Sequence, residues 1–169
     1  MQLSATLAIP TTASAAFEIM TDRDFAQFSC DESNMKLISA DVDRDAPGGI
    51  TSVVRRSMPS TVIPANFRSF VGSDIEMRQT EVWSRPQSGS VSDRTGTFDL
   101  EIVGAPVRIA GRLALTSDGS SSTLVYSGDV SASIPFFGAT IEKSVAQAII
   151  QVLADVERLF AKWIEKQGL

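Results

Sequence analysis

The sequence predicts an α+β fold in which a curved, seven-stranded antiparallel sheet wraps around a long carboxy-terminal helix. Three observations lead to this prediction. One strand-like segment opens the chain, six extended segments follow one another between short turns, and one long amphipathic segment closes it. Sequential strands joined by short turns form an antiparallel sheet, and its apolar face needs a cover. Only the final helix is long enough to supply that cover.

The first strand and two short helices come before the main run of strands. Residues 2–9 alternate apolar and polar side chains, which is typical of a half-buried strand. Residues 11–20 and 21–30 each begin with residues suited to capping a helix, and each carries large apolar side chains three positions apart. Thr21 or Asp22 is expected to cap the second of these helices.

Six extended segments follow, separated by turn residues. Residues 47–49, Pro-Gly-Gly, are expected to form the turn of the first hairpin. Residues 60–72 have two prolines within reach and are expected to form a connector with at most one helical turn. The six segments cover residues 34–45, 50–58, 73–84, 91–103, 107–116 and 122–134.

The segment 138–167 is predicted to be one amphipathic helix. Its apolar side chains recur at spacings of three and four, and its charged and amide side chains occupy other faces. The apolar series is Ile141, Val145, Ile149, Val152, Val156, Leu159 and Trp163. At ~1.5 Å per residue such a helix extends about 42 Å, long enough to cross the whole sheet.

The composition excludes several classes of function. The 169 residues suit one domain, and 15 basic against 20 acidic residues give a net charge of −5. Nucleic acids and anionic membranes are poor partners for such a surface, because phosphate binding needs dense positive charge. Cys30 is the one cysteine, which excludes an internal disulfide and leaves too few ligands for a cysteine-based zinc site. We expect it to be a small buried filler at a helix end.

The amino terminus has neither a basic segment nor a sustained apolar one, and no window approaches the ~18 apolar residues of a membrane span. We therefore expect a cytoplasmic protein without integral membrane association. The oligomeric state stays open.

The order of elements resembles the helix-grip fold of the START and birch-pollen-allergen superfamily, also called SRPBCC proteins. The segment "MQLSATLAIPTTASAAFEIMTD" looks like the opening of that superfamily, a strand followed by a helix after a proline-containing turn. More narrowly, "EMRQTEVW" and "YSGDVSASIPFFGATIEKSVAQAI" resemble a bacterial branch described only as a domain of unknown function. The resemblance covers essentially the whole chain, so one START-like helix-grip domain is expected over residues 1–169.

This resemblance implies a cavity between the sheet and the long helix, where members of the superfamily bind lipids, sterols, polyketides or other apolar molecules. We expect this chain to bind or carry a small hydrophobic ligand there, with no cofactor. Two alternatives stay open. One is an enzyme of the cyclase or dehydratase type that uses the same cavity. The other is an interaction module like the chaperone-activating members, which act through their surface.

Strand parity selects the side chains of the sheet that face the helix, and the apolar stripe supplies those of the helix that face the sheet. The alternatives for both groups are ligand contact and plain core packing. The candidates for ligand contact are Met77, Trp83, Phe98, Leu100, Ile109, Leu113, Tyr126, Val130, Ile141, Val145, Ile149 and Val152. Gly96, Gly111 and Gly128 share this parity, and each is expected either to bend its strand or to leave room in the concavity.

Polar residues on the inward parity are the more informative class, because burying them without partners costs a few kcal/mol. They are Arg56, Gln79, Glu81 and Arg94. Three interpretations stay open: a buried ion pair, a bulge or strand end that lets them reach solvent, or a role in which Arg56 or Arg94 orients an oxygen-rich ligand.

Catalytic residues are sparse in this chain. Histidine is absent, so the commonest general base is missing. We therefore predict no catalytic residues; Glu81 with Tyr126 is the one acid–base combination worth testing. Asp74 with Glu76, and Asp99 with Glu101, fall on the outward parity, where a solvated face is expected. No metal site is expected.

The stretch "IPFFG" at residues 134–138 joins the last strand to the long helix. Pro135 is expected to end the strand, and Gly138 to free the backbone for the helix. Two alternatives stay open for Phe136 and Phe137. Either both rings are buried against the short helices, or one packs on the first helical turn while the other gates the opening of the cavity.

Overall fold

The computed structural model describes residues 1–63, 65–86 and 92–169. The start of the strand expected from position 91 and part of the segment between it and the preceding strand therefore lie outside the described residues. The elements are β1 (Gln2–Ile9), α1 (Ala13–Met20), α2 (Arg23–Glu32), β2 (Lys36–Asp43), β3 (Ile50–Pro59), η1 (Ser60–Val62), η2 (Ala65–Phe70), β4 (Asp74–Trp83), β5 (Arg94–Ile102), β6 (Val107–Asp118), β7 (Ser121–Ala132) and α3 (Gly138–Gln167).

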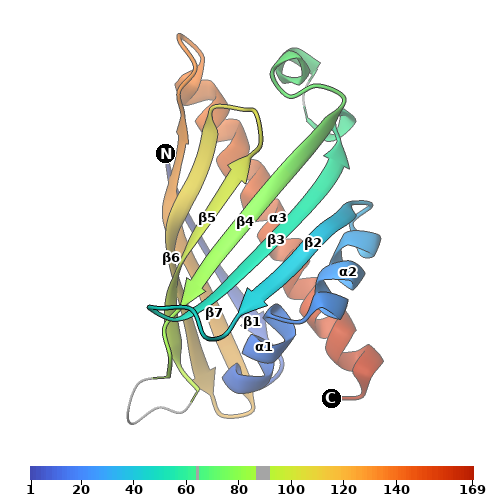
Figure 1. Cartoon of the computed structure of the whole chain (residues 1–169), viewed down its shortest axis with the longest axis vertical. Coiled ribbons are helices and arrows are strands. Elements are labelled where there is room, and N and C mark those ends of the chain that lie inside the picture. Colours follow the sequence, from blue (N-terminus) through green and yellow to red (C-terminus); the bar gives the residue numbers. More distant parts are fainter. Residues whose placement is uncertain (64, 87–91) are drawn as a thin grey trace.

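The strands form one seven-stranded antiparallel sheet in the order β1-β7-β6-β5-β4-β3-β2. Strands β2 to β7 follow one another as a meander, and β1 joins the far edge beside β7. The hairpin between β2 and β3 turns at Gly48 and Gly49, which both have positive φ angles, as their place in the sequence predicts. Figure 1 shows α3 running diagonally behind the curved sheet. The predicted helix-grip architecture is confirmed.

The two short helices begin at side-chain caps. The Thr12 hydroxyl oxygen accepts a hydrogen bond from the Ala15 amide at the start of α1, at 3.3 Å. The Asp22 carboxylate accepts one from the Asp24 amide at the start of α2, at 2.8 Å. Of the two caps predicted for the second helix, Asp22 is the one that forms.

α3 packs mainly on β1, β7 and α2, and it ends at Gly168, whose φ of 70° is left-handed. Its last turns meet α2 through aromatic rings. Phe25 lies 4.8 Å from Phe160 between ring centroids, and Phe28 lies 5.1 Å from Trp163. α2 thus packs against the carboxy-terminal end of α3.

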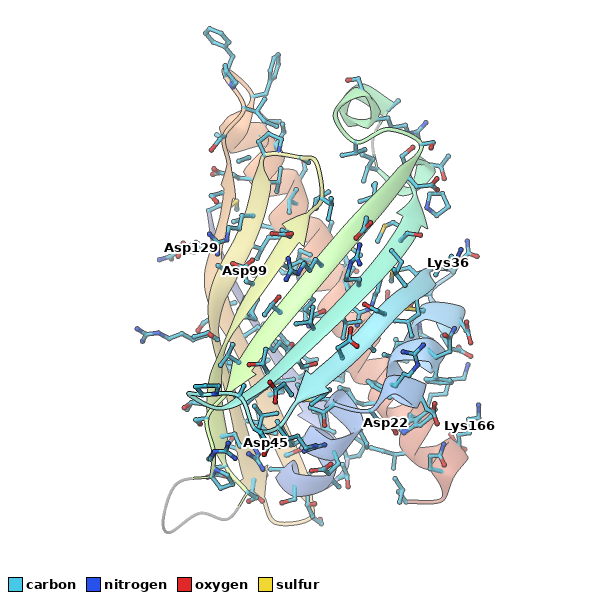
Figure 2. The ribbon with its side chains drawn as sticks, viewed as in Figure 1. Asp22, Lys36, Asp45, Asp99, Asp129 and Lys166 are labelled. Carbon is cyan, nitrogen blue, oxygen red and sulfur yellow. The ribbon has the colours of Figure 1, made fainter. Side chains whose placement is uncertain are left out.

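The outward face of the sheet is charged. Arg55 on β3 pairs with Glu76 on β4, and Arg108 on β6 pairs with Asp99 on β5. Figure 2 shows the side chains of Asp99 and Asp129 on this side of the sheet. The solvated face predicted for the outward carboxylates is confirmed, and the concave face is the one left for packing and binding.

The inward glycines Gly111 and Gly128 mark a close approach of β6 and β7. A Cβ atom added to Gly111 would lie 2.1 Å from the carbonyl oxygen of Ser127, and one added to Gly128 would lie 2.3 Å from that of Ala110. The space beside Gly96 is taken by the ring of Trp83, at 3.2 Å. Of the two predicted roles, that of leaving room in the concavity is wrong, because neighbouring backbone or side-chain atoms fill the space beside each glycine.

The connector between β3 and β4 differs from the prediction of at most one helical turn. It holds two 3₁₀ segments, η1 with three residues and η2 with six. The guanidinium of Arg68 stabilises this arrangement, because it donates to the carbonyl oxygens of Thr61 and Ile63, both at 3.1 Å. Such contacts between a side chain and the backbone leave no pattern of apolar spacing in the sequence.

The prediction that Phe136 and Phe137 are buried against the short helices is wrong. Phe136 is 102% exposed and Phe137 is 58% exposed. Their connection lies at the end of the molecule remote from α1 and α2 (Figure 1). At the first turn of α3, Ile141 is buried and Gly138 lies tightly against the Ala132 carbonyl oxygen, 2.8 Å from where a Cβ atom would lie.

Candidate functional site

The pairing of β3 with β4 gathers polar side chains on the concave face. Ser52 lies opposite Glu81, and Val54 lies opposite Gln79. Arg56 is two positions further along β3 on the same face, so its side chain lies diagonally across from that of Gln79. The parity of two strands thus places a guanidinium, an amide and a carboxylate in one row.

These groups form a continuous hydrogen-bonded chain. Arg56 Nη1 donates to Gln79 Oε1 at 2.8 Å, and Gln79 Nε2 donates to Glu81 Oε1 at 2.6 Å. The indole Nε1 of Trp83 donates to Glu81 Oε2 at 2.9 Å. The Gln79 amide therefore stands between the two charged groups, in place of the buried ion pair that was one of the predicted alternatives.

Tyr126 extends this chain of polar groups from a strand further along the sheet, on the same concave face. It comes from β7, and its hydroxyl is hydrogen-bonded to Glu81 on β4. Its ring packs edge-to-face on Phe98, with 5.4 Å between ring centroids. The curvature of the sheet brings these groups together although β5 and β6 lie between their strands. The predicted pairing of Glu81 with Tyr126 is thus present as a contact.

Burial controls the protonation of this pair. Desolvation raises the pKa of Glu81, against the opposing effect of the hydrogen bonds from Trp83 and Gln79 and of the Arg56 charge. Desolvation, followed by the charge of Glu81, raises the pKa of Tyr126 well above its ordinary value. Glu81 is 6% exposed, so its oxygen atoms serve the protein's own donors. Glu81 therefore binds a proton more tightly than a carboxyl group in water does, and the donors around it fix the direction of the hydrogen bonds in the network.

Cys30 lies at the Arg56 end of this chain. It comes from α2, is fully buried, and is hydrogen-bonded to the Arg56 guanidinium. Burial raises the pKa of its thiol more than the neighbouring guanidinium lowers it. A neutral buried thiol is a packing group, which agrees with the predicted filler.

Arg94 lies apart from the network. As the first residue of β5 it reaches toward α1, where its guanidinium carbon is 3.9 Å from the Phe17 ring centroid. Arg94 Nη1 donates to the carbonyl oxygen of Ser84 at 3.4 Å, and desolvation lowers the pKa of this side chain. Of the two predicted inward arginines, only Arg56 is brought together with Glu81.

The apolar stripe of α3 is covered unevenly. Ile141 near one end is 5% exposed, and Leu159 near the other is 2% exposed. Between them Val145 and Ile149 are only half-buried, and Val152 is 41% exposed. The predicted stripe is thus buried at both ends and only partly covered at these three positions, whereas Ala146 and Leu153 on the same middle turns are buried.

The inward side chains of the sheet divide in the same way. The fully buried candidates are Trp83, Phe98, Ile109, Leu113, Tyr126 and Val130. The half-buried ones are Arg56, Met77, Arg94 and Leu100, together with Met58 and Ile102, which the prediction did not include as ligand contacts. β4 and β5 pair Gln79 with Leu100 and Met77 with Ile102, so one open apolar patch borders the polar chain.

The structure contains two hollows that were not predicted from the sequence. One of about 200 Å³ lies between the α1–α2 junction and the β2–β3 edge, lined by Met20, Ala26, Ala40, Val42 and Val54 with four polar residues. Another of about 420 Å³ lies around the turn between β5 and β6, on the outer side near Arg108. Short side chains facing each other across α2 and β2 were the available signal for the first, and no pattern marked the second.

Within residues 1–63, 65–86 and 92–169, no helix has the length and apolar character needed to span a membrane. In the same part of the chain no three acidic or sulfur ligands gather at one point where a metal ion could be held.

The sequence profile of a family described as "Protein of unknown function (DUF2505)" matches residues 4–164. No protein with a curated description matches the sequence.

Several solved structures are similar in fold. The aromatase/cyclase Zhui from Streptomyces sp. R1128 gives a TM-score of 0.60 at 8% identity, covering 100% of this chain and 96% of that one. TTHA0849 from Thermus thermophilus gives 0.59 at 14% identity, covering 96% and 98%. Human STARD10 gives 0.60 at 11% identity, covering 98% of this chain and 66% of that one. These likenesses confirm the START and birch-pollen-allergen-like helix-grip fold.

Proposed function

Because the chain belongs to the family described as protein of unknown function (DUF2505), whose description names no activity, we propose a function from the geometry. The protein binds or carries a small hydrophobic ligand, lipid-like or polyketide-like, between the concave face of the sheet and α3. The proposal assigns the protein a binding function and names the class of its ligand, without identifying one molecule.

One observation carries this proposal. The apolar stripe of α3 is buried at Ile141 and Leu159 but only half-buried at Val145 and Ile149. The middle turns do bury Ala146 and Leu153, so the incomplete cover is confined to the side of the helix that carries Val145 and Ile149. Incomplete cover over several apolar turns supports a binding surface, because apolar area exposed to water gains free energy when a ligand covers it.

The sheet side supports the same interpretation. Met77 and Leu100 are half-buried on the concave face, and Leu100, like Val145 and Ile149, packs against the edge of the core. The polar chain from Arg56 to Glu81 borders this apolar patch. A mostly apolar lining with a few placed polar groups is typical of small-molecule sites.

The fold is compatible with this proposal. A norcoclaurine synthase point mutant from Thalictrum flavum, with a TM-score of 0.54 and 11% identity, was solved in complex with a transition-state analogue. It covers 100% of this chain and 96% of its own. The likeness concerns the fold, and the ligand of that protein is not carried over.

A tryptophan placed on the open side of α3 tests the proposal. We expect purified protein to take up the apolar dye Nile red, and Ile149→Trp to weaken that uptake roughly tenfold by filling the space. Ile150→Trp is the matched control, since Ile150 is 43% exposed on another face of the helix and its change should leave uptake intact. The measurement is a fluorescence titration with both variants checked for folding by circular dichroism.

Native mass spectrometry of the purified protein, followed by organic extraction, is the companion measurement. A protein that carries no extractable molecule and takes up no dye has a filled interior, and the proposal then fails. Equal loss of dye uptake in Ile149→Trp and Ile150→Trp would also count against it, because the effect would not follow the open face.

A further inference from the structure

Arg56 has hydrogen-bond donors that the protein does not use. A guanidinium carries five N–H donors. Its contacts within the described residues are the Gln79 amide oxygen, at 2.8 Å, and the Cys30 thiol. None of the ion pairs of the described residues includes Arg56. The side chain is half-buried, and the described buried atoms without partners, Arg94 Nε and Ser122 Oγ, do not belong to it. Its free N–H groups therefore remain accessible on the concave side.

The surroundings of these free donors are apolar. Leu37 on β2 and Met77 on β4 flank Arg56 in the register of the sheet. Met77 and Leu100 are half-buried apolar side chains on the same concave face. A cation at the border of an open apolar surface fits a ligand that has an anionic end and an apolar body.

The rest of the network orients Arg56 without forming a direct ion pair with it. Gln79 turns its carbonyl oxygen to Arg56 because its amide nitrogen donates to Glu81 at 2.6 Å. Glu81 is held in turn by Trp83 and Tyr126. Desolvation raises the pKa of Glu81.

We propose that the ligand of the concave face is an amphiphile with a carboxylate head, which pairs with the free N–H groups of Arg56, while its apolar tail lies along Met77, Leu100 and Ile149. This inference rests on the proposed function, and it adds the charge and the position of the head group.

Two probes of equal chain length separate the head group from the tail. Decanoate and decanol, each below the concentration at which it forms aggregates, are titrated by isothermal calorimetry at neutral pH. We expect decanoate to bind roughly 10- to 100-fold more tightly than decanol, which is the effect of one hydrogen-bonded charge pair. Arg56→Met should remove this preference and leave decanol binding nearly unchanged, whereas Arg56→Lys should keep part of it.

Arg55→Met is the matched control. Arg55 is adjacent on β3 but faces outward, where it pairs with Glu76, so its loss should keep the preference for decanoate. If wild-type protein binds both probes equally, the carboxylate head is wrong while the apolar site stands. If neither probe binds, the head group and the proposed function fail together. A preference for decanoate that persists in Arg56→Met would show that Arg56 does not bind the head group. If Arg56→Met does not fold, the ratio of the decanoate and decanol affinities of the wild-type protein still tests the carboxylate head.

Discussion

Glu81 shows how a buried carboxyl group is accommodated in this core. It keeps 6% of its surface exposed, and it accepts hydrogen bonds from Gln79, Trp83 and Tyr126. An unpaired buried polar group costs about 1–3 kcal/mol. Three donors reduce that cost, but burial still raises the pKa of Glu81 because the charged form loses its hydration.

This raised pKa makes stability depend on pH. The pKa of Glu81 in the folded protein lies above the ordinary value of 4.5, so the folded state holds the proton more tightly than the unfolded state. The contribution of Glu81 to the free energy of unfolding is therefore fully present below about pH 4.5 and is lost as the pH rises through the folded pKa. The Glu81→Gln variant lacks this proton.

Urea unfolding at a series of pH values from acid to neutral measures the difference between wild type and Glu81→Gln. We expect wild type to lose stability relative to the variant as the pH rises. A difference that stays constant with pH would show that the environment of Glu81 does not perturb its proton binding.

Alternation along a strand predicts which face of the sheet a side chain lies on, but the neighbouring strand decides what that position contacts. Alternation correctly places Arg56, Gln79 and Glu81 on one face. It also places Gly111 and Gly128 inward, but it does not say whether a glycine leaves a space or allows contact. The backbone of the neighbouring strand decides that, because the carbonyl oxygens of Ser127 and Ala110 occupy the positions of the missing Cβ atoms.

Gly111→Val should therefore destabilise the protein by about 2 kcal/mol or more, since the added Cβ atom meets backbone 2.1 Å away and the strands must separate. Ala110→Val is the matched change on the outward face of the same strand. It should stay within about 0.5 kcal/mol of wild type, because a β-branched residue suits a strand. Midpoints of chemical unfolding give both values, and equal effects would contradict the close approach of β6 and β7.

Over the whole molecule, cover of the concave face is uneven. The aromatic rings of α2 and of the last turns of α3 form a closed core at one end, where Phe160 is 1% exposed and Trp163 is 7% exposed. On the middle turns of α3, Val145 and Ile149 are only half-buried. The molecule thus combines a tightly packed aromatic end with a stretch of α3 whose apolar side chains are only partly covered.

Hydrogen exchange should follow this division. Amides in the middle of α3, from Val145 to Val156, are expected to exchange faster than those from Leu159 to Ile164, because fewer buried contacts oppose local opening there. Exchange measured on peptic fragments by mass spectrometry resolves the two parts of the helix. Uniform protection along α3 would indicate that its middle is as firmly held as its aromatic end.

The sequence by itself determined the α+β class, the order of strands and helices, the long helix over 138–167 and the inward parity of Arg56, Gln79 and Glu81. These features follow from periodicities of two and 3.6 residues, which are properties of the chain alone. Only the tertiary structure decided that Gln79 links Arg56 to Glu81 and that Tyr126 reaches Glu81 across two strands. It also decided that Arg94 lies apart on Phe17, and that Phe136 and Phe137 project into solvent. The physical reason is that these outcomes depend on the curvature of the sheet and on which surfaces meet across it, and neither is encoded in the spacing of residues along one strand.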